Sequence, residues 1–236
     1  MTIPTNPAAL AVLADGCLDG RSALVTGGGS GIGRASALLL ARLGAKVAVT
    51  GRREEELAET AALAAAAGYE HPILPVSCDV REPENVDAML DEVLAKQGYI
   101  DILVNNAGGQ FMAPAESITY NGFRAVTRLN LDATWYITTQ VASRSMIERG
   151  YGKIVSITMT PRRGLPGMSH SSAARAGVES LTRTLSVEWG KYGIRTAAIA
   201  PGIVHTAAWE RYGLDPDMMG EKMPTNRLQS ADDVAS

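Results

Sequence analysis

The feature that most constrains the fold of this chain is a regular alternation of short apolar runs with longer helical patterns. The runs span residues 22–26, 46–50, 73–77, 101–104, 153–157 and 195–200. They are almost continuously apolar, which is typical of strands buried on both faces of a parallel sheet. Helical patterns fall between them, at 32–43, 54–67, 84–96, 123–147 and 172–191. Strands that alternate with helices predict an α/β chain with right-handed crossovers and a doubly wound parallel sheet in three layers.

Length and composition fit one folded domain. The chain has 236 residues, of which 46% are hydrophobic and 20% are charged, and these are ordinary values for a globular protein. No interior linker rich in Ser, Gly or Pro splits the alternation, so we expect residues 18–236 to form a single domain. Residues 1–17, which include Pro4, Asn6 and Pro7, are expected to form an N-terminal arm.

The composition also disfavours several classes of partner. The formal net charge is −3, so no basic excess is available to bind a phosphate backbone, and we expect no nucleic-acid partner. No apolar stretch reaches the ~18 residues of a membrane-spanning helix, and no basic region precedes the apolar N-terminus, so a secretory signal is not expected. Cys17 and Cys78 lie far apart without metal-ligand spacing, which predicts no metal site and suits the reducing cytoplasm.

A glycine-rich segment follows the first predicted strand and leads directly into the first predicted helix. It reads Thr26-Gly27-Gly28-Gly29-Ser30-Gly31-Ile32-Gly33. Glycine permits positive φ, and its missing Cβ lets a pyrophosphate approach the backbone, while the helix N-terminus offers free N–H groups to the anion. In this strand-to-helix context the motif predicts a dinucleotide-binding domain of the Rossmann type. The residues expected at the cofactor are Gly27, Ser30, Gly31, Ile32 and Gly33.

The end of the second predicted strand favours NADP over NAD. Folds that take NAD place a carboxylate here to bind the ribose 2′-hydroxyl, but this strand ends Thr50-Gly51-Arg52-Arg53. A guanidinium matches a 2′-phosphate in charge and geometry, so we expect Arg52 to bind NADPH through that phosphate. The alternative is that both arginines are solvated charges at the start of a helix.

Further motifs, in the expected order, carry a resemblance to the short-chain dehydrogenase/reductase family. The glycine turn is similar to the family's Thr-Gly-x-x-x-Gly-x-Gly pattern, and Asn105-Asn106-Ala107-Gly108 is similar to its Asn-Asn-Ala-Gly signature. The resemblance covers roughly residues 18–236 and implies a role for Asn130 in the catalytic set. The further cofactor residues that it implies are Asp79 and Val80 at the adenine, Asn106, Ala107 and Gly108 after the fourth strand, and Pro201, Gly202 and Thr206 near the nicotinamide.

The chain departs from the family at its catalytic Tyr-x-x-x-Lys motif. Ser171 stands at the tyrosine position and Arg175 at the lysine position, and this spacing places both on one helical face. Serine is a much poorer acid than a phenol, and arginine does not exchange its proton. We therefore expect cofactor binding to be retained and ordinary ketone reduction to be lost. Counting from this motif makes Thr158 the counterpart of the family's catalytic serine, whereas counting from the strand makes it Met159.

One branch of the family is similar even at this motif. The segment His170-Ser171-Ser172-Ala173-Ala174-Arg175-Ala176-Gly177-Val178 resembles the peroxisomal-type trans-2-enoyl-CoA reductases, as does Gly108-Gly109-Gln110-Phe111. The related 2,4-dienoyl-CoA reductases use an additional tyrosine in the loop after the fifth strand, and residues 158–164 contain none. The resemblance implies NADPH-dependent reduction of the C2–C3 double bond of an enoyl-CoA, or a similar enoyl thioester, in fatty-acid metabolism. Two alternatives stay open: a carbonyl reductase acting on 3-ketoacyl or other ketones, and a catalytically silent nucleotide-binding subunit.

Roles for the site residues follow from this resemblance. Hydride delivery to the enoyl group places negative charge on the thioester oxygen, and Ser171 is expected to donate a hydrogen bond to it. Arg175 is expected to hold the cofactor ribose, and Asn130 to order water or a helix backbone. The alternative for Ser171 is a helix N-cap, a position that favours serine.

Four residues are expected at the substrate. Gln110 and Phe111 belong to the shared stretch, and His170 adjoins the catalytic frame with a pKa near neutrality. Arg81 follows the adenine pair and is a candidate for a phosphate of coenzyme A, although each such arginine is more often an ordinary surface charge. The acyl group is expected on coenzyme A or a carrier protein.

The resemblance also bears on assembly and on the C-terminus. Family members form tetramers or dimers through two long helices, here residues 123–147 and 172–191, so a homo-oligomer is expected. Ser230-Ala231-Asp232-Asp233 predicts an N-cap and an acidic first turn, after which family members continue with that helix and a final edge strand. We therefore expect the C-terminal helix and last strand to be missing, which leaves a peroxisomal location open beside the cytoplasmic one.

Overall fold

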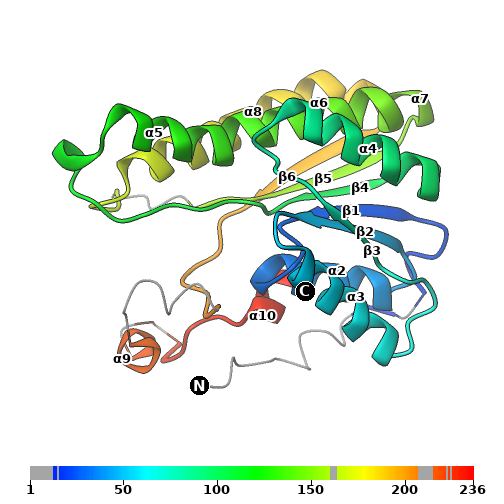
Figure 1. Cartoon of the computed structure of the whole chain (residues 1–236), viewed down its shortest axis with the longest axis horizontal. Coiled ribbons are helices and arrows are strands. Elements are labelled where there is room, and N and C mark those ends of the chain that lie inside the picture. The colour runs from blue at the N-terminus through cyan, green and yellow to red at the C-terminus, as the bar shows by residue number, and fades with distance from the viewer. Residues whose placement is uncertain (1–12, 15, 160–163, 207–214, 222, 224) are drawn as a thin grey trace.

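The core of the fold is a parallel sheet of six strands with helices on both faces (Figure 1). The computed structural model describes residues 13–14, 16–159, 164–206, 215–221, 223 and 225–236. The strands are β1 (Ser22–Thr26), β2 (Lys46–Gly51), β3 (Leu74–Ser77), β4 (Ile102–Asn105), β5 (Gly152–Ile157) and β6 (Ile194–Ile199). They pair in parallel in the order β3-β2-β1-β4-β5-β6. The predicted doubly wound sheet in three layers is confirmed.

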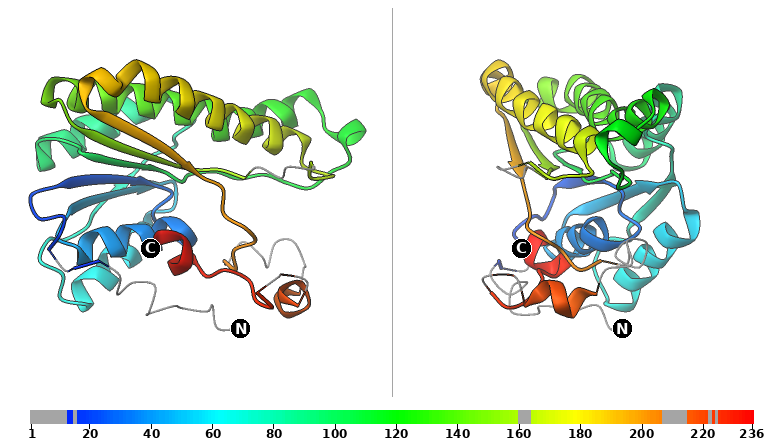
Figure 2. Two further views of the ribbon diagram at one scale, coloured as in Figure 1. Left: turned by 180° about the vertical axis from the view of Figure 1, so that it is seen from behind. Right: turned by 90° about the vertical axis from the view of Figure 1, so that its left-hand side faces the viewer.

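Helices cover the two faces unequally. Helices α4, α5, α6 and α8 lie on one face, and α2, α3 and α10 lie on the other (Figures 1 and 2). The bounds are α2 (Gly31–Arg42), α3 (Glu54–Ala66), α4 (Pro83–Gln97), α5 (Tyr120–Thr127), α6 (Ala133–Val141), α7 (Ile147–Arg149), α8 (Ser169–Trp189), α9 (Pro216–Gly220) and α10 (Ala231–Ala235). Short stretches of 3-10 helix, η1 (Ala115–Ser117) and η4 (Gly190–Tyr192), and of π-helix, η2 (Arg128–Asp132) and η3 (Ala142–Met146), complete them.

Successive side chains of the central strand β1 enter two different cores. Leu24 packs into the core beneath α4 and α6, whereas Ala23 and Val25 pack into the core beneath α2 and α3. Side chains alternate between the faces of a strand, so a strand with a core on each side needs an apolar residue at every position. This is the physical reason for the unbroken apolar runs in the sequence.

The strand order reverses between β1 and β4, and this reversal positions the site. The chain winds outward from β1 through β2 to β3, and then from β4 through β5 to β6. In open α/β sheets a crevice forms at such a switch point, outside the carboxyl ends of the strands. The loops that follow Thr26 and Asn105 therefore meet at this edge, and they carry the glycine turn and the Asn-Asn-Ala-Gly motif.

The long helical segments differ from their predicted bounds. The segment predicted at residues 123–147 is helical from Tyr120 to Arg149 and turns twice into π-helix, at η2 and η3. Helix α8 begins at Ser169, three residues before its predicted start at Ser172, with Met168 as its N-cap. Ser171 therefore lies inside the first turn, and the alternative that it is the N-cap is excluded.

The C-terminal helix α10 packs against α2. Ser230 is the N-cap of α10 and forms a capping box with Asp233, as the sequence predicts. Val204 and Gln229 form an isolated parallel bridge, and no seventh strand occurs in the described residues. Within the same ranges, no helix combines the length and the apolar composition needed to cross a membrane. Residues 1–12 and 15 of the expected N-terminal arm lie outside the described part of the chain.

Candidate active site

A cleft of about 970 Å³ lies at the carboxyl ends of the strands. The predicted cofactor residues that line it are Gly27, Ser30, Gly31, Ile32, Arg52, Asp79, Val80, Asn106, Ala107, Gly108, Arg175 and Thr206. Of the predicted substrate residues, Gln110 and Phe111 line it as well. Gly33, Pro201, Gly202, Arg81, His170, Ser171, Asn130 and Thr158 lie outside this lining. The sequence interpretation missed Gly29, Gly51, Arg53, Glu56, Leu57, Cys78, Gly109, Met112, Leu129 and Ile157.

The glycine turn leaves the N-terminus of α2 open to an anion. The N-cap Ser30 makes no side-chain capping bond, and the first turn holds no acidic residue, so the free N–H groups and the positive end of the helix dipole face the cleft uncompensated. Gly33 packs the helix onto the turn, because a Cβ at this position would lie 2.2 Å from the carbonyl oxygen of Gly27. Gly33 thus shapes the site from behind rather than lining it.

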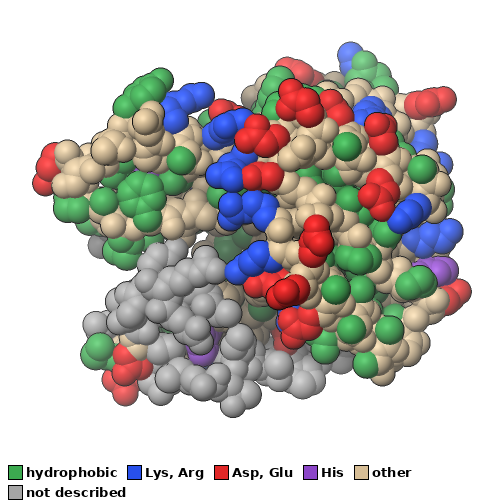
Figure 3. Space-filling model, viewed as in Figure 1, with side chains coloured by type: hydrophobic (Ala, Val, Ile, Leu, Met, Phe, Trp, Pro, Cys, Tyr) green, Lys and Arg blue, Asp and Glu red, His purple; other side chains and the backbone are tan. Residues whose placement is uncertain are grey.

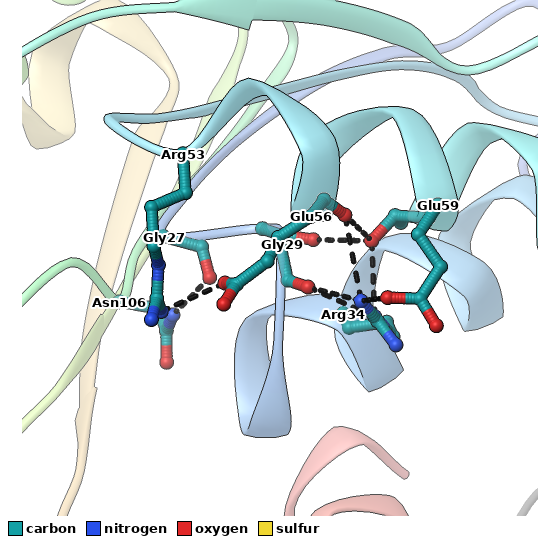
Figure 4. A network of polar contacts seen from close by, with 9 residues as sticks. Gly27, Gly29, Arg34, Arg53, Glu56, Glu59 and Asn106 are labelled. Carbon is teal, nitrogen blue, oxygen red and sulfur yellow. Dashed lines mark hydrogen bonds and ion pairs between the residues drawn. The ribbon is translucent and has the colours of Figure 1, made fainter. Parts of the chain in front are cut away.

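Arg34 ties the glycine turn to α3 and was missed in the sequence interpretation. Its Nε donates to the carbonyl oxygen of Gly29 at 2.9 Å, and its Nη2 donates to the Glu59 carboxylate at 2.6 Å (Figure 4). Thr60 Oγ1, which donates to the Gly28 carbonyl at 3.0 Å, adds a second link between α3 and the turn. An arginine one turn into the helix after a glycine motif is the signal that could have identified this anchor.

Side chains also join the loops that follow β1 and β4. Thr26 Oγ1 accepts hydrogen bonds from the backbone N–H groups of Asn106 and Ala107, both at 3.0 Å. Asn106 Nδ2 donates in return to the carbonyl oxygens of Thr26 at 3.0 Å and Gly27 at 3.1 Å. Asn106 lines the cleft, and its polar contacts hold the two loops in register.

Arg52 and Arg53 both line the cleft at the end of β2, but they differ in their partners. Arg53 forms an ion pair with Glu56 at 2.7 Å. Arg52 is exposed and has no hydrogen bond or ion pair within the described ranges, so its guanidinium is available to a ligand. On the face shown in Figure 3, several Lys and Arg side chains form a column, with acidic side chains next to it.

Arg175 is a buried cation without an acidic partner in the described part of the chain. Its Nη1 donates to the carbonyl oxygen of Ile157 at 2.6 Å, and 9% of the residue is exposed, in the cleft. Burial lowers the pKa of Arg175 to about 10, so the guanidinium stays charged at neutral pH. A Cβ on Gly108 would lie 2.0 Å from Arg175 Nη2 and 2.7 Å from Asn130 Oδ1, so only glycine fits between them. A buried charge of this kind requires a compensating ligand.

Asn130 lies in the π-helix η2 and uses its whole side-chain amide to hold the backbone. Its Nδ2 donates to the carbonyl oxygens of Gly109 at 2.7 Å and Val126 at 2.8 Å. Its Oδ1 accepts the N–H of Gly109 at 3.2 Å. Of the two predicted roles, this geometry fits the ordering of a helix backbone, and it pins the loop after Gly108 against η2.

Ser171 and His170 are fully buried in the first turn of α8, and neither lines the cleft. Ser171 stands one helical turn before Arg175 on the same face, and its Oγ has no hydrogen-bond partner in the described structure. His170 Nδ1 accepts the N–H of Ser171 at 2.8 Å, and its Nε2 has no partner there either. Burial lowers the pKa of His170. The His170 ring meets Phe111 edge to face, with centroids 4.5 Å apart.

Two predicted site residues are engaged elsewhere. Thr158 Oγ1 lies 3.2 Å from the Ile199 carbonyl oxygen and 3.3 Å from the Glu179 carboxylate, so its hydroxyl joins β5 to β6 and α8 rather than facing the cleft. Arg81 is held by Asp79, whose carboxylate accepts from Nε at 2.9 Å and from Nη2. This pairing lowers the pKa of Asp79 to about 2 and engages the Arg81 guanidinium. Counting along the sequence could not reveal either partner.

These features agree with a comparison of the chain with known families. Residues 21–216 match the family described as short chain dehydrogenase. The chain belongs to the short chain dehydrogenase family. Among solved structures, a citronellol catabolism dehydrogenase of Pseudomonas aeruginosa PAO1 is 41% identical, with a TM-score of 0.83 over 95% of this chain and 87% of the other. This oxidoreductase family membership confirms the resemblance drawn from the glycine turn and the Asn-Asn-Ala-Gly motif.

Two further relatives of this short chain dehydrogenase bear on chemistry. A Bacillus subtilis (strain 168) protein named "Probable 2,4-dienoyl-CoA reductase [(2E)-enoyl-CoA-producing]" is 39% identical over 225 residues, which cover 93% of this chain and 88% of the relative. The F189W actinorhodin polyketide ketoreductase, solved with NADPH, is 32% identical, with a TM-score of 0.86 over 91% of this chain and 87% of the other. No group of His, Cys, Asp or Glu that could hold a metal ion occurs in the described ranges.

Proposed function

We propose that this chain, with residues 18–236 as one domain, reduces the C2–C3 double bond of an enoyl-CoA with NADPH. The observation that carries the proposal is the position and burial of Arg175. This residue stands at the family's lysine position, it is buried in the cleft, and in the described part of the chain its one hydrogen bond is to the carbonyl of Ile157. A site that keeps a fixed cation for the cofactor, but has lost the phenol that protonates a ketone, is suited to double-bond reduction.

The residues present fit a reduced dinucleotide phosphate. The uncapped N-terminus of α2 is suited to the pyrophosphate, and the unpaired Arg52 at the end of β2 is suited to a 2′-phosphate. Arg175 can donate from its remaining guanidinium N–H groups to ribose hydroxyls. The first and third contacts are common to NADH and NADPH, so the proposed preference for NADPH rests on Arg52.

When bound, the reduced nicotinamide supplies a hydride to C3 of the enoyl thioester and is left oxidised. The electron pair of the C2–C3 double bond then moves toward the thioester oxygen, and a proton from water adds at C2 to complete the saturated acyl thioester. Negative charge therefore develops at an oxygen that the protein must stabilise, and fixed hydrogen-bond donors in a dry site do this best.

Ser171 is the donor that we assign to this oxygen. Its hydroxyl is buried and unpaired in the described structure, and it lies one turn from Arg175 on α8. A buried hydroxyl without a partner is costly unless a ligand completes its hydrogen bond. Asn130 contributes indirectly, because its amide positions the loop at Gly109.

A 2,4-dienoyl-CoA is a second candidate substrate, favoured by the name of the Bacillus subtilis relative. Its conjugated double bonds also deliver charge to the thioester oxygen, so the same donors would serve. The missing tyrosine after β5 argues for the simpler enoyl substrate, although residues 160–163 of that loop lie outside the described structure.

We also propose a homo-oligomer formed through the outer faces of α6 and α8. Trp135 on α6 is 50% exposed and Val187 on α8 is 85% exposed, and large apolar side chains at such positions are typical of interfaces. Sedimentation of the wild type and of Val187→Glu tests this assembly. A wild type that is monomeric at assay concentration would refute it.

A thioester panel tests the proposed reaction. Crotonyl-CoA, a longer 2-enoyl-CoA, a 2,4-dienoyl-CoA and a 3-ketoacyl-CoA are each assayed with NADPH and with NADH. We expect oxidation of NADPH with the 2-enoyl substrates and none with the ketone. Turnover of the ketone alone would indicate a carbonyl reductase, and NADPH binding without any turnover would indicate a silent subunit.

A further inference from the structure

Two successive residues at the start of α8 carry buried polar atoms without partners. His170 and Ser171 are both 0% exposed, and His170 Nε2 and Ser171 Oγ lack hydrogen-bond partners in the described structure. Buried polar groups in native proteins are nearly always paired, and exceptions mark sites of function or bound molecules. The assignment of Ser171 above uses only one of these atoms, so Nε2 of His170 needs its own explanation.

The geometry identifies Nε2 as a donor. His170 Nδ1 accepts the backbone N–H of Ser171 at 2.8 Å, and a ring nitrogen that accepts a hydrogen bond carries no proton. The neutral ring must then carry its proton on Nε2. Burial disfavours a second proton and lowers the pKa of His170, and a backbone hydrogen bond with Met168 offsets only part of this effect. The side chain is therefore a neutral N–H donor held in one orientation by the helix.

Phe111 connects this donor to the cleft. Its ring lines the cleft and is 40% exposed, and it packs against the His170 ring at an interplanar angle of 87°. The N–H of Ala113 donates to the carbonyl oxygen of Gly167 at 3.0 Å, which holds the Phe111 loop beside the turn that precedes α8. Movement of one partly exposed ring would thus join His170 to the cleft.

We propose that His170 donates a hydrogen bond from Nε2 to the thioester oxygen of the substrate once the acyl group displaces the Phe111 ring. No proton is transferred in this step, because a neutral imidazole is far too weak an acid and keeps its Nε2 proton throughout. The N–H polarises the carbonyl and stabilises the charge that hydride addition places on its oxygen. This inference rests on the proposed enoyl-thioester reduction and adds a catalytic residue to it.

Two amide substitutions of His170 separate the role of its Nε2 donor from that of its Nδ1 contact with the helix backbone. His170→Asn places an acceptor near the position of Nδ1 and removes the Nε2 donor, whereas His170→Gln places an N–H near the position of Nε2. We expect kcat to fall about 100-fold in His170→Asn, the typical effect of losing one such donor, with NADPH affinity and melting temperature unchanged. His170→Gln should recover at least tenfold of that loss. His71→Asn, on a distant loop, is the matched control and should equal the wild type.

The tautomer of His170 can be measured independently of turnover. The chain has three histidines, so nitrogen NMR of histidine-labelled protein, with His170 assigned by His170→Gln, resolves each ring. At neutral pH we expect His170 to be protonated on Nε2 alone and its Nε2 resonance to shift when NADP and butyryl-CoA bind together. A proton on Nδ1, a doubly protonated ring or an unmoved resonance would overturn the assignment.

The failures of the two proposals are distinguishable. A wild type without turnover on any enoyl or dienoyl thioester refutes the proposed reaction and, with it, the role of His170. A wild type that turns over while His170→Asn retains full kcat refutes the role of His170 alone. A fall in both kcat and melting temperature that His170→Gln does not reverse would show a purely structural role and would also overturn the inference.

Discussion

The guanidinium of Arg175 donates to the carbonyl oxygen of Ile157 across 2.6 Å, which anchors a buried cation at the carboxyl end of β5. This bond uses one of the five N–H groups of the side chain. The rest of the guanidinium lies against Gly108 without an acidic partner in the described ranges. We therefore assign to the cofactor the partner of this cation that the described part of the chain does not supply.

Replacing Arg175 with methionine should weaken NADPH binding without unfolding the protein. Methionine keeps much of the buried volume but removes the charge and the donors, and hydrogen bonds to a charged group contribute about 1.5–3 kcal/mol, so we expect Kd to rise at least tenfold. The melting temperature should stay the same or rise, because an unpaired buried charge is removed. Fluorescence titration and calorimetry measure both quantities. Arg183→Met, at an exposed position of the same helix, is the control, and equal effects of the two substitutions would argue against a cofactor role.

Arg52 should determine the preference between the two cofactors. Arg52→Ser removes the unpaired guanidinium at the end of β2, so we expect affinity for NADPH to fall about 10- to 100-fold, the equivalent of ~1.5–3 kcal/mol, and affinity for NADH to change little. The neighbouring Arg53→Ser breaks an ion pair with Glu56 and should have a smaller effect. Steady-state kinetics with both cofactors decide the point, and an unchanged ratio of kcat/KM for NADPH to NADH in Arg52→Ser would contradict the assignment.

Loss of the Arg34 anchor should loosen the glycine turn. Arg34→Met removes the bonds to the Gly29 carbonyl and to Glu59, so we expect a loss of about 1–2 kcal/mol in the free energy of unfolding and a several-fold rise in the Kd of NADPH. Glu59→Gln retains the bond to Gly29 and should leave Kd unchanged. Urea unfolding combined with cofactor titration measures both effects. An Arg34→Met protein that binds NADPH as tightly as the wild type would show that the turn holds its shape without this anchor.

The ion pair between Asp79 and Arg81 should make stability depend on pH in the acid range. The pKa of Asp79 is about 2 in the folded chain against an ordinary value of 3.8, so its contribution is present above pH 4 and is lost as the pH falls through 4 toward 2. With allowance for partial exposure, we expect Asp79→Asn to cost about 1–2 kcal/mol at pH 7 and progressively less below pH 4. Urea unfolding at a series of pH values tests this. Asp91→Asn, in an exposed ion pair with Arg144, is the control, and a penalty for Asp79→Asn that stays constant down to pH 2 would contradict the pairing.

The sheet was predictable from sequence because its strands need apolar residues at every position. The predicted bounds of β1 match the observed ones, and those of β2 to β6 differ by at most one residue at either end, since the apolar runs extend to the edges of the cores. No pattern in the sequence indicated the π-helix at η2, in which Asn130 bonds to Gly109, 21 residues earlier in the chain.

Contacts from distant elements also decided which predicted residues reach the site. Local patterns located Arg52 and Arg175 in the cleft, since a strand end and a helical spacing fix their direction. Thr158 and Arg81 lie outside the cleft lining, and their side chains are engaged by Glu179 and by the nearby Asp79. The packing of His170 against Phe111 likewise depends on tertiary structure. The spacing of residues along the sequence does not indicate it.

The most direct test of the proposed reaction follows the hydride itself. The wild type is incubated with crotonyl-CoA and NADPH deuterated at its transferable position, and the acyl product is examined by mass spectrometry and NMR. The account predicts butyryl-CoA with one deuterium on C3 and none on C2, where a solvent proton adds. Recovery of unlabelled crotonyl-CoA, while a 3-ketoacyl-CoA is converted to a hydroxyacyl product with deuterium on its carbinol carbon, would contradict it.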